Sequence, residues 1–292
     1  MDINWYPGHM AKAKRQLSQQ LGRVDAVIEL CDARLPHASR NPDLDRLAAG
    51  KARVLILNKE DLADAAETQA WLNAFHAQGL QAMAYVSTAG KTKQAFDLIA
   101  RVSREAVERA AQRGVHKTVR AMVVGVPNVG KSTFINQVAK RKSAKAGNRP
   151  GVTRGKQWVS VDAGLELLDT PGILWPKFED ETTGIHLAFT GAVKDEIMDL
   201  ETLACHLIEL LARRYPQALA ERYKLEADPG LPGWELLELC GKKRGFRISG
   251  GEVDTERMAK VLLDEYRSGK LGNLTFETPQ DLESREAAHG RD

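Results

Sequence analysis

Several absences in this 292-residue sequence exclude whole classes of protein. Cysteine occurs at only three scattered positions, with no C-x-x-C pair and no Cys/His spacing, so neither a disulfide framework nor a zinc site is indicated. The first 23 residues carry charges but no apolar block, so no signal peptide is predicted. No apolar run approaches the roughly 18 residues that cross a bilayer. We therefore expect a soluble, cytoplasmic protein without membrane contact.

Composition and charge indicate a globular protein with one strongly basic segment. Hydrophobic residues make up 43% and charged residues 28% of the chain, and its length suggests about two domains. The net charge is only +3, but Arg101 to Ser160 contains fourteen basic residues and two acidic ones. This concentration is suited either to a polyanion such as RNA or to the phosphates of a bound nucleotide.

The first 170 residues alternate short apolar runs with helical patterns. The apolar runs are rich in Val, Ile and Leu and predict buried strands at residues 24–30, 53–57, 80–86 and 119–125. Helices are expected between them at residues 66–77 and 95–111. Residues 157–161 and 165–168 predict a hairpin that adds an antiparallel edge. The fold class expected is α/β, with a mostly parallel, doubly wound sheet.

A second, helical domain is expected to follow this one. After Lys177 the strand-like runs stop, and leucines recur at helical spacing between Leu200 and Leu211. We predict domains at residues 1–177 and 178–280, followed by a polar tail at 281–292. The first domain is expected to open with a basic amphipathic helix at residues 9–21.

The segment Gly125–Ser132 matches the phosphate-loop pattern G-x-x-x-x-G-K-[ST] and lies between a predicted strand and a helical run. Its backbone amides are expected to surround the β-phosphate, at the positive end of the following helix. Lys131 would bridge the β- and γ-phosphates and assist catalysis, while Ser132 would bind Mg²⁺. The predicted nucleotide contacts in this segment are Asn128, Val129, Gly130, Lys131, Ser132 and Thr133.

Two further motifs predict recognition of guanine. Asn58-Lys59-Glu60-Asp61 directly follows a strand, and the Asp61 carboxylate can accept from both the ring N–H and the exocyclic amine of guanine. Adenine presents a bare acceptor there and would leave the charge unpaired. Lys59 would lie along the base, and Asn58 would join this loop to the phosphate loop. A backbone amide of Ser87-Thr88 would donate to guanine O6.

Two other positions complete a predicted magnesium site. Asp169 in Asp169-Thr-Pro-Gly172 would bind Mg²⁺ through water, and the Gly172 amide would contact the γ-phosphate. Thr153 lies between the phosphate loop and this motif, and its hydroxyl would complete the Mg²⁺ ligands when GTP is bound.

The order of these motifs is unusual, because the base-reading motifs precede the phosphate loop. One nucleotide site forms only if the chain is circularly permuted, which surface termini permit. In this order, and in its opening Trp5-Tyr6-Pro7-Gly8-His9-Met10 and its segment Asp32-Ala33-Arg34-Pro36, the sequence resembles circularly permuted ribosome-assembly GTPases of the YlqF/RbgA type. The resemblance implies a GTPase that matures the large ribosomal subunit, with its helical domain on ribosomal RNA. We expect it to be monomeric when free.

The group that activates water is not the usual one. Ile173 stands where Ras-type enzymes have a glutamine, so intrinsic hydrolysis should be slow and stimulated by the ribosomal partner. The resemblance suggests two substitutes, namely His9 as a group that accepts from water and K⁺ bound by Asn128.

Three alternatives stay open at this point. A GTPase could act on a protein effector without RNA, although the basic run of Lys140 to Lys156 favours phosphate contact. A phosphotransferase could use the same phosphate loop, but the guanine motif argues against it. A purely structural RNA-binding module would not need Lys131.

Overall fold

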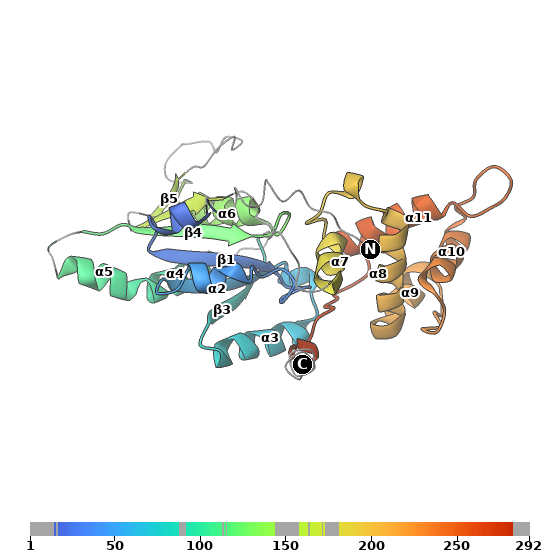
Figure 1. Cartoon of the computed structure of the whole chain (residues 1–292), viewed down its shortest axis with the longest axis horizontal. Helices are drawn as coiled ribbons and strands as arrows, with labels where there is room; N and C mark the ends of the chain where they lie inside the picture. Colours follow the sequence, from blue (N-terminus) through green and yellow to red (C-terminus); the bar gives the residue numbers. More distant parts are fainter. Residues whose placement is uncertain are drawn as a thin grey trace. The chain divides into compact units, whose positions relative to one another are not determined.

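The computed structural model describes residues 15, 17–87, 92–112, 114, 116–143, 158–162, 164–170, 172 and 181–282. The chain divides into two compact units (Figure 1). The first, called the sheet unit, contains the described parts of residues 4–61, 65–177 and 277–292. The second, called the helical unit, contains Leu62–Asp64 and the described part of Phe178–Phe276.

The sheet unit is built on six strands in the order β3-β2-β1-β4-β6-β5. Five strands are parallel, and β5 pairs antiparallel with β6 at one edge. This confirms both the parallel sheet and the antiparallel hairpin predicted from the sequence. The strand bounds are β1 (Ala26–Asp32), β2 (Ala52–Asn58), β3 (Gln81–Tyr85), β4 (Val119–Gly125), β5 (Trp158–Asp162) and β6 (Leu165–Asp169).

Helices cover the sheet, with α3 beside β3 and α6 beside β5 (Figure 1). The predicted helix at residues 95–111 is wrong as a single element, because it divides at Ser103 into two helices. The Ser103 side chain makes no capping hydrogen bond, so serine capping does not account for the break. The bounds are α2 (Asp43–Leu47), η1 (Glu60–Leu62), α3 (Ala65–Ala77), α4 (Thr92–Val102), α5 (Arg104–Ala111) and α6 (Lys131–Ser143).

The core explains why these runs form strands. Every residue of β1 is buried, as expected for a central strand covered on both faces. On one face, Leu17 and Leu21 of the N-terminal helical segment pack with Met122, Val124 and Leu168 of the central strands. The described end of the predicted apolar stripe therefore lies on the sheet, whereas residues 9–14 and 16 of the predicted helix lie outside the described residues.

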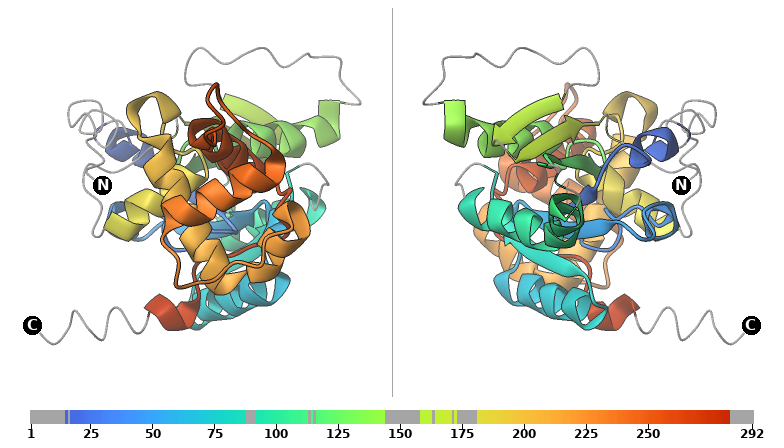
Figure 2. Two further views of the ribbon diagram at one scale, coloured as in Figure 1. Left: turned by 90° about the vertical axis from the view of Figure 1, so that its right-hand side faces the viewer. Right: turned by 90° about the vertical axis from the view of Figure 1, so that its left-hand side faces the viewer.

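The helical unit packs around α8, which contacts both α10 and α11 (Figure 2). Leu203, Leu207 and Leu211 are buried, whereas Leu200 and Leu210 are half-buried. No helix in the described part of the chain is long and apolar enough to cross a membrane. The bounds are α7 (Glu181–Phe189), η2 (Asp195–Ile197), α8 (Leu200–Arg214), α9 (Pro216–Tyr223), α10 (Gly233–Arg244) and α11 (Thr255–Arg267).

The chain passes between the two units close to the predicted base-reading motif. Within the helical unit, Leu274 N donates to Leu62 O at 3.0 Å, so the residue directly after Asp61 belongs to that unit. The chain returns to the sheet unit at Glu277, whose carboxylate accepts from His37 N at 2.7 Å. Trp71 Nε1 also donates to Glu277 O at 2.8 Å. Short segments thus belong to the unit that they contact rather than to their neighbours in sequence.

Candidate active site

The parallel strands bring the predicted motifs to one edge of the sheet. In the register of the sheet, Asp32 at the end of β1 lies beside Asn58 at the end of β2. On the other side of β1, Leu30 lies beside Gly125 of β4, and Val123 of β4 lies beside Asp169 of β6. Carboxyl ends of parallel strands form the usual ligand-binding edge of such sheets. Motifs that lie far apart in the sequence therefore come to the same edge of the sheet, despite their permuted order.

The phosphate loop joins β4 to α6 with Asn128 and Gly130 in left-handed backbone conformations, at φ of 58° and 98°. Lys131 opens α6, and its Nζ donates to the carbonyl oxygens of Gly125 at 3.0 Å and Val126 at 2.8 Å. Burial lowers the pKa of Lys131 to about 8, although the charge of Asp169 opposes this shift. The ammonium is thus withdrawn from water inside its own loop, where its electrostatic attraction for an anion is stronger than in water.

Asn58 connects the base-reading motif to the phosphate loop. Its side-chain amide donates to Val129 O at 2.7 Å, and its Oδ1 accepts from Ser87 N at 3.2 Å and Ser87 Oγ at 2.8 Å. A Cβ at Gly130 would lie 2.5 Å from Asn58 Nδ2, so glycine is required for this approach. The expected link between the two motifs is present, and Ser87 is part of it.

Ser132 and Asp169 form the next contact along the edge. Ser132 Oγ donates to Asp169 Oδ2 at 3.2 Å, which brings a hydroxyl and a carboxylate oxygen together beside the phosphate loop. Oxygen ligands of this kind are the ones Mg²⁺ prefers, so these residues fit the ion. Gly172 lies against the phosphate loop, where an added Cβ would be 2.7 Å from Pro127 Cα.

The remaining predicted site residues differ in exposure, and some of them lie outside the described part of the chain. Asp61 lies in η1 with an exposed side chain, and Thr133 is exposed in the first turn of α6. Val129 is buried and accepts from Asn58. His9, Thr88 and Thr153 lie outside the described residues.

A charged cluster at the end of β1 was missed as a functional feature by sequence reasoning. Asp32 accepts from Arg34 Nε and Nη2, each at 2.9 Å, and from Lys59 Nζ at 2.9 Å. Burial alone would raise the pKa of Asp32, but the charges of Arg34 and Lys59 bring it well below its usual range. The signal in the sequence was a carboxylate at the end of a predicted buried strand, quoted only as part of the resemblance.

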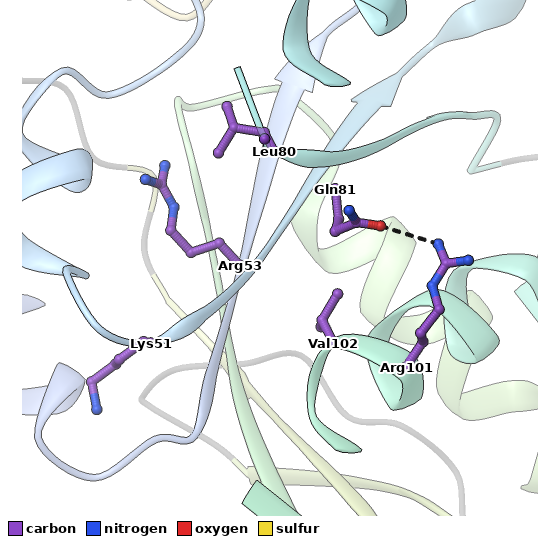
Figure 3. A pocket seen from close by; sticks show the side chains of 7 residues that line it. Lys51, Arg53, Leu80, Gln81, Arg101 and Val102 are labelled. Carbon is purple, nitrogen blue, oxygen red and sulfur yellow. Dashed lines mark hydrogen bonds between the residues drawn. The ribbon is translucent and has the colours of Figure 1, made fainter. Parts of the chain in front are cut away.

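A cavity of about 530 Å³ lies at the opposite edge of the sheet, where β2 and β3 begin (Figure 3). Two basic side chains that line the cavity already have partners within the protein. Lys51 Nζ donates to Val24 O at 2.9 Å, and Arg53 pairs with Glu29 at 3.0 Å. The dashed line in Figure 3 joins Arg101 to Gln81 at 3.3 Å. No predicted nucleotide-binding residue lines this cavity, so it is separate from the site.

A phosphate loop, a guanine motif bonded to it and a magnesium-type pair on one edge define a circularly permuted P-loop GTPase. Residues 120–227 match the family described as 50S ribosome-binding GTPase. Ribosome biogenesis GTPase A of Priestia megaterium is 47% identical over 286 residues, which cover 97% of this chain and 99% of that protein. The chain belongs to the Ribosome biogenesis GTPase A family, which confirms the predicted resemblance; it is a GTPase that serves ribosome biogenesis.

Solved structures agree with this assignment. A GDP-bound structure of TM YlqF matches with a TM-score of 0.69 and 28% identity, over 91% of this chain and all of that one. GNP-bound YlqF from T. maritima matches with a TM-score of 0.64 and 29% identity, over 92% of this chain and 98% of that one. Both alignments span most of the sheet and helical units, so the permuted order is shared along the chain.

Proposed function

We propose that this GTPase assists assembly of the large ribosomal subunit and that its nucleotide state controls binding to the precursor particle and its rRNA. The observation that carries the proposal is the bond from Asn58 to Val129, which joins base-reading and phosphate-binding segments in one site. The description of the matching family, 50S ribosome-binding GTPase, supports the choice of subunit. The protein would act in the cytoplasm, as a monomer when free.

GTP and GDP would bind across the carboxyl edge of the sheet. Asp61 would accept from guanine, and Lys59 would lie along the base. Of the two predicted amides, that of Thr88 would donate to O6, because Ser87 N already donates to Asn58 Oδ1. At the other end, the amides of the loop would surround the β-phosphate, and Lys131 would leave its two carbonyl partners for the phosphate oxygens. The predicted contacts of the loop are Asn128, Val129, Gly130, Lys131, Ser132 and Thr133.

Magnesium would be held by Ser132 directly, by Asp169 through water and by Thr153 when GTP is present. The ion would neutralise charge that develops between the β- and γ-phosphates. The Gly172 amide would donate to the γ-phosphate. Its position against Pro127 leaves no room for a side chain, so glycine is required there. Asn128 would bind a K⁺ ion, and its left-handed backbone turns the loop at that point.

Hydrolysis would depend on the ribosomal partner. Ile173 and Leu174 follow Gly172 and cannot bind the attacking water, so His9 is the candidate that accepts from it. An imidazole suits this role because it exchanges a proton near neutral pH.

The helical unit would contact rRNA. Lys243 of α10 and Arg247 in the turn after it are exposed, and Arg257 of α11 lies over the Phe246 ring, 4.3 Å from its centre. Exposed cations of this kind favour backbone phosphates, and we expect recognition of RNA shape. The basic segment of residues 140–156 would also contact RNA phosphates.

The test is GTP hydrolysis with purified large or small ribosomal subunits, at two salt concentrations and with K⁺ or Na⁺. We expect stimulation by large subunits only, weaker at high salt. The matched control is Lys131→Ala, which should abolish stimulated hydrolysis. Equal stimulation by both subunits would contradict the choice of particle, and stimulation by a protein free of RNA would favour an effector. Equal hydrolysis rates in K⁺ and Na⁺ would contradict the proposed binding of K⁺ by Asn128.

A further inference from the structure

We propose that Asp32 is a positioning residue for the nucleotide: together with Arg34 it anchors the Lys59 ammonium, so that the alkyl stem of Lys59 is ordered before the base arrives. The proposal rests on the guanine site proposed above and adds a residue that takes no part in reading the base itself. Its basis is the cluster of Asp32, Arg34 and Lys59, because phosphate binding and base recognition leave the two buried members, Asp32 and Arg34, unexplained.

The carboxylate of Asp32 has donors at both oxygens. Oδ1 accepts from Arg34 N at 3.1 Å and from Arg34 Nε at 2.9 Å. Oδ2 accepts from Arg34 Nη2 at 2.9 Å and from Lys59 Nζ at 2.9 Å. Arg34 therefore holds the carboxylate in one orientation with three of the four hydrogen bonds, and Lys59 donates the fourth. Paired planar groups of this kind fix geometry as well as charge.

The exposed fractions of the three side chains show that Lys59 is the member of the cluster that reaches solvent. Asp32 is 2% exposed and Arg34 is 1% exposed, whereas the side chain of Lys59 is 23% exposed. The backbone of the segment is also fixed, because Asp32 N donates to Ser39 Oγ at 2.9 Å and Ala33 N donates to Asn58 O at 2.8 Å. Asp32 and Arg34 thus form a rigid base, and Lys59 extends from it toward solvent.

Lys59 is constrained at its backbone end as well. Its φ is 62°, a left-handed conformation that non-glycine residues seldom adopt without a structural reason. The preceding residue, Asn58, is bonded to the phosphate loop through Val129. Both ends of the lysine are therefore fixed, which leaves the alkyl stem as an ordered apolar surface. A free lysine side chain would lose its rotamer freedom on binding the base, so ordering it beforehand favours affinity.

This arrangement predicts a particular pattern of binding. Because the stem would lie on the face of the ring rather than at its edge, its contribution should be the same for different purine diphosphates. Asp61 reads the edge, so it should set the preference among them. The phosphate loop should not depend on Asp32, since Lys131 has its own partners in Gly125 and Val126.

The test is a set of equilibrium titrations with GDP, IDP and inorganic pyrophosphate. Asp32→Asn should weaken GDP and IDP by about tenfold each and leave pyrophosphate unchanged. Lys59→Met keeps the stem but removes the anchored ammonium, and it should give a similar loss. Because both changes break one contact, the double variant should also lose only about tenfold.

The matched control is Glu29→Gln. Glu29 lies on the same strand, is also 2% exposed and pairs with Arg40 and Arg53. In the described part of the chain its hydrogen bonds and ion pairs go to these arginines and to Asn41 N, not to Lys59. Its substitution should leave the GDP titration unchanged. Since Asp32→Asn leaves Arg34 buried without its counter-charge, Asp32→Asn with Arg34→Gln removes both charges together and should show the same tenfold loss if the single variant does not fold.

Four results would overturn the proposal. The first two are unchanged GDP binding in the folded Asp32→Asn variant and a loss near a hundredfold when Asp32→Asn is combined with Lys59→Met. The other two are an equal loss of pyrophosphate binding in Asp32→Asn and an equal loss of GDP binding in Glu29→Gln. Failure of the guanine site itself would look different. In that case Asp61→Asn would not alter the preference for GDP over XDP, whatever the Asp32 variants do.

Discussion

At the residue scale, backbone conformations that side chains disfavour gather at the nucleotide edge. Among the described residues, three non-glycine positions have a left-handed φ, and two of them, Lys59 and Asn128, belong to the nucleotide motifs. The third, Lys224, is the C-cap of α9, an ordinary place for that conformation. Such strain persists where surrounding contacts over-determine the backbone, as they do around Asn58 and Val129.

Gly130→Ala tests how closely the two motifs must approach. The new Cβ would lie 2.5 Å from Asn58 Nδ2, at a φ of 98° that alanine tolerates poorly. We expect unfolding free energy to fall by about 1–3 kcal/mol and GDP affinity to fall by at least tenfold. The measurements are urea unfolding and GDP titration. Gly164→Ala is the control, since nothing lies within 4 Å of its Cβ and it should be neutral. Normal GDP binding by Gly130→Ala would contradict the required contact.

Residue patterns predicted part of the site and not the rest. The phosphate loop follows from a local motif, because a short loop between a strand and a helix has few backbone paths. The link from Asn58 to Val129 spans 71 residues, and it was predictable because both motifs are expected to bind one nucleotide. The pairing of Asp32 with Lys59 depends on the register of β1 against β2. That register arises from packing of the whole sheet, so a local pattern cannot give it.

At the element scale, buried strands were predictable within two residues, and β4 has the predicted bounds. Continuous apolar runs of that length leave few alternatives. The division at Ser103 was not predictable from apolar spacing, which continues across it. Nor was the placement of Leu62–Asp64 in the helical unit, because its partners Leu274 and Thr275 lie more than 200 residues away.

Three helices of the helical unit meet at one buried carboxylate. Glu265 of α11 accepts from Arg222 and from Tyr223 Oη of α9, and from Arg244 Nη2 of α10 at 2.7 Å. Burial alone would raise the pKa of Glu265, but hydrogen bonds from Arg222 and Tyr223 and the charge of Arg244 lower it to about 2. The ionised form therefore stabilises the packing of α9, α10 and α11.

Glu265→Gln should lower the free energy of unfolding by about 2–3 kcal/mol at neutral pH, because it leaves two arginines without their shared counter-charge. A carboxyl whose folded pKa lies below its unfolded value stabilises fully above the unfolded pKa, here 4.5. The difference between the two proteins should thus shrink as pH falls from about 4.5 to about 2. Urea unfolding at several pH values measures it.

Glu256→Gln is the control for this prediction. Glu256 lies on the same helix and pairs with Lys260, but it is 69% exposed, so its removal should change stability by less than about 0.5 kcal/mol. A pH-independent difference for Glu265→Gln would contradict the account of the cluster.

At the scale of the whole molecule, the permutation places the nucleotide motifs next to segments of the helical unit along the chain. Asp61 is followed at once by a segment of the helical unit, and Gly172 precedes that unit by only a few residues. Both ends of the proposed nucleotide site are therefore connected covalently to the unit proposed to bind rRNA. We expect the γ-phosphate to alter the arrangement of the two units, as switch loops do in other GTPases.

Small-angle scattering with a non-hydrolysable GTP analogue and with GDP tests this expectation, in the presence of rRNA. Different envelopes are expected, and Gly172→Ala should remove the difference, because its Cβ would overlap Pro127. Identical envelopes and identical RNA affinities in the two nucleotide states would refute nucleotide control.

The central claim is that a permuted chain forms one pocket, with guanine recognition at Asp61 and phosphate binding at Lys131. Asp61→Asn should convert the protein to one that binds XDP, because the amide complements xanthine where the carboxylate complements guanine. Titration of XDP into Asp61→Asn, with and without Lys131→Ala on the same chain, measures whether the two residues share one ligand. The account predicts that XDP binding is lost in the double variant; XDP binding that persists undiminished would place the two residues in different sites and contradict it.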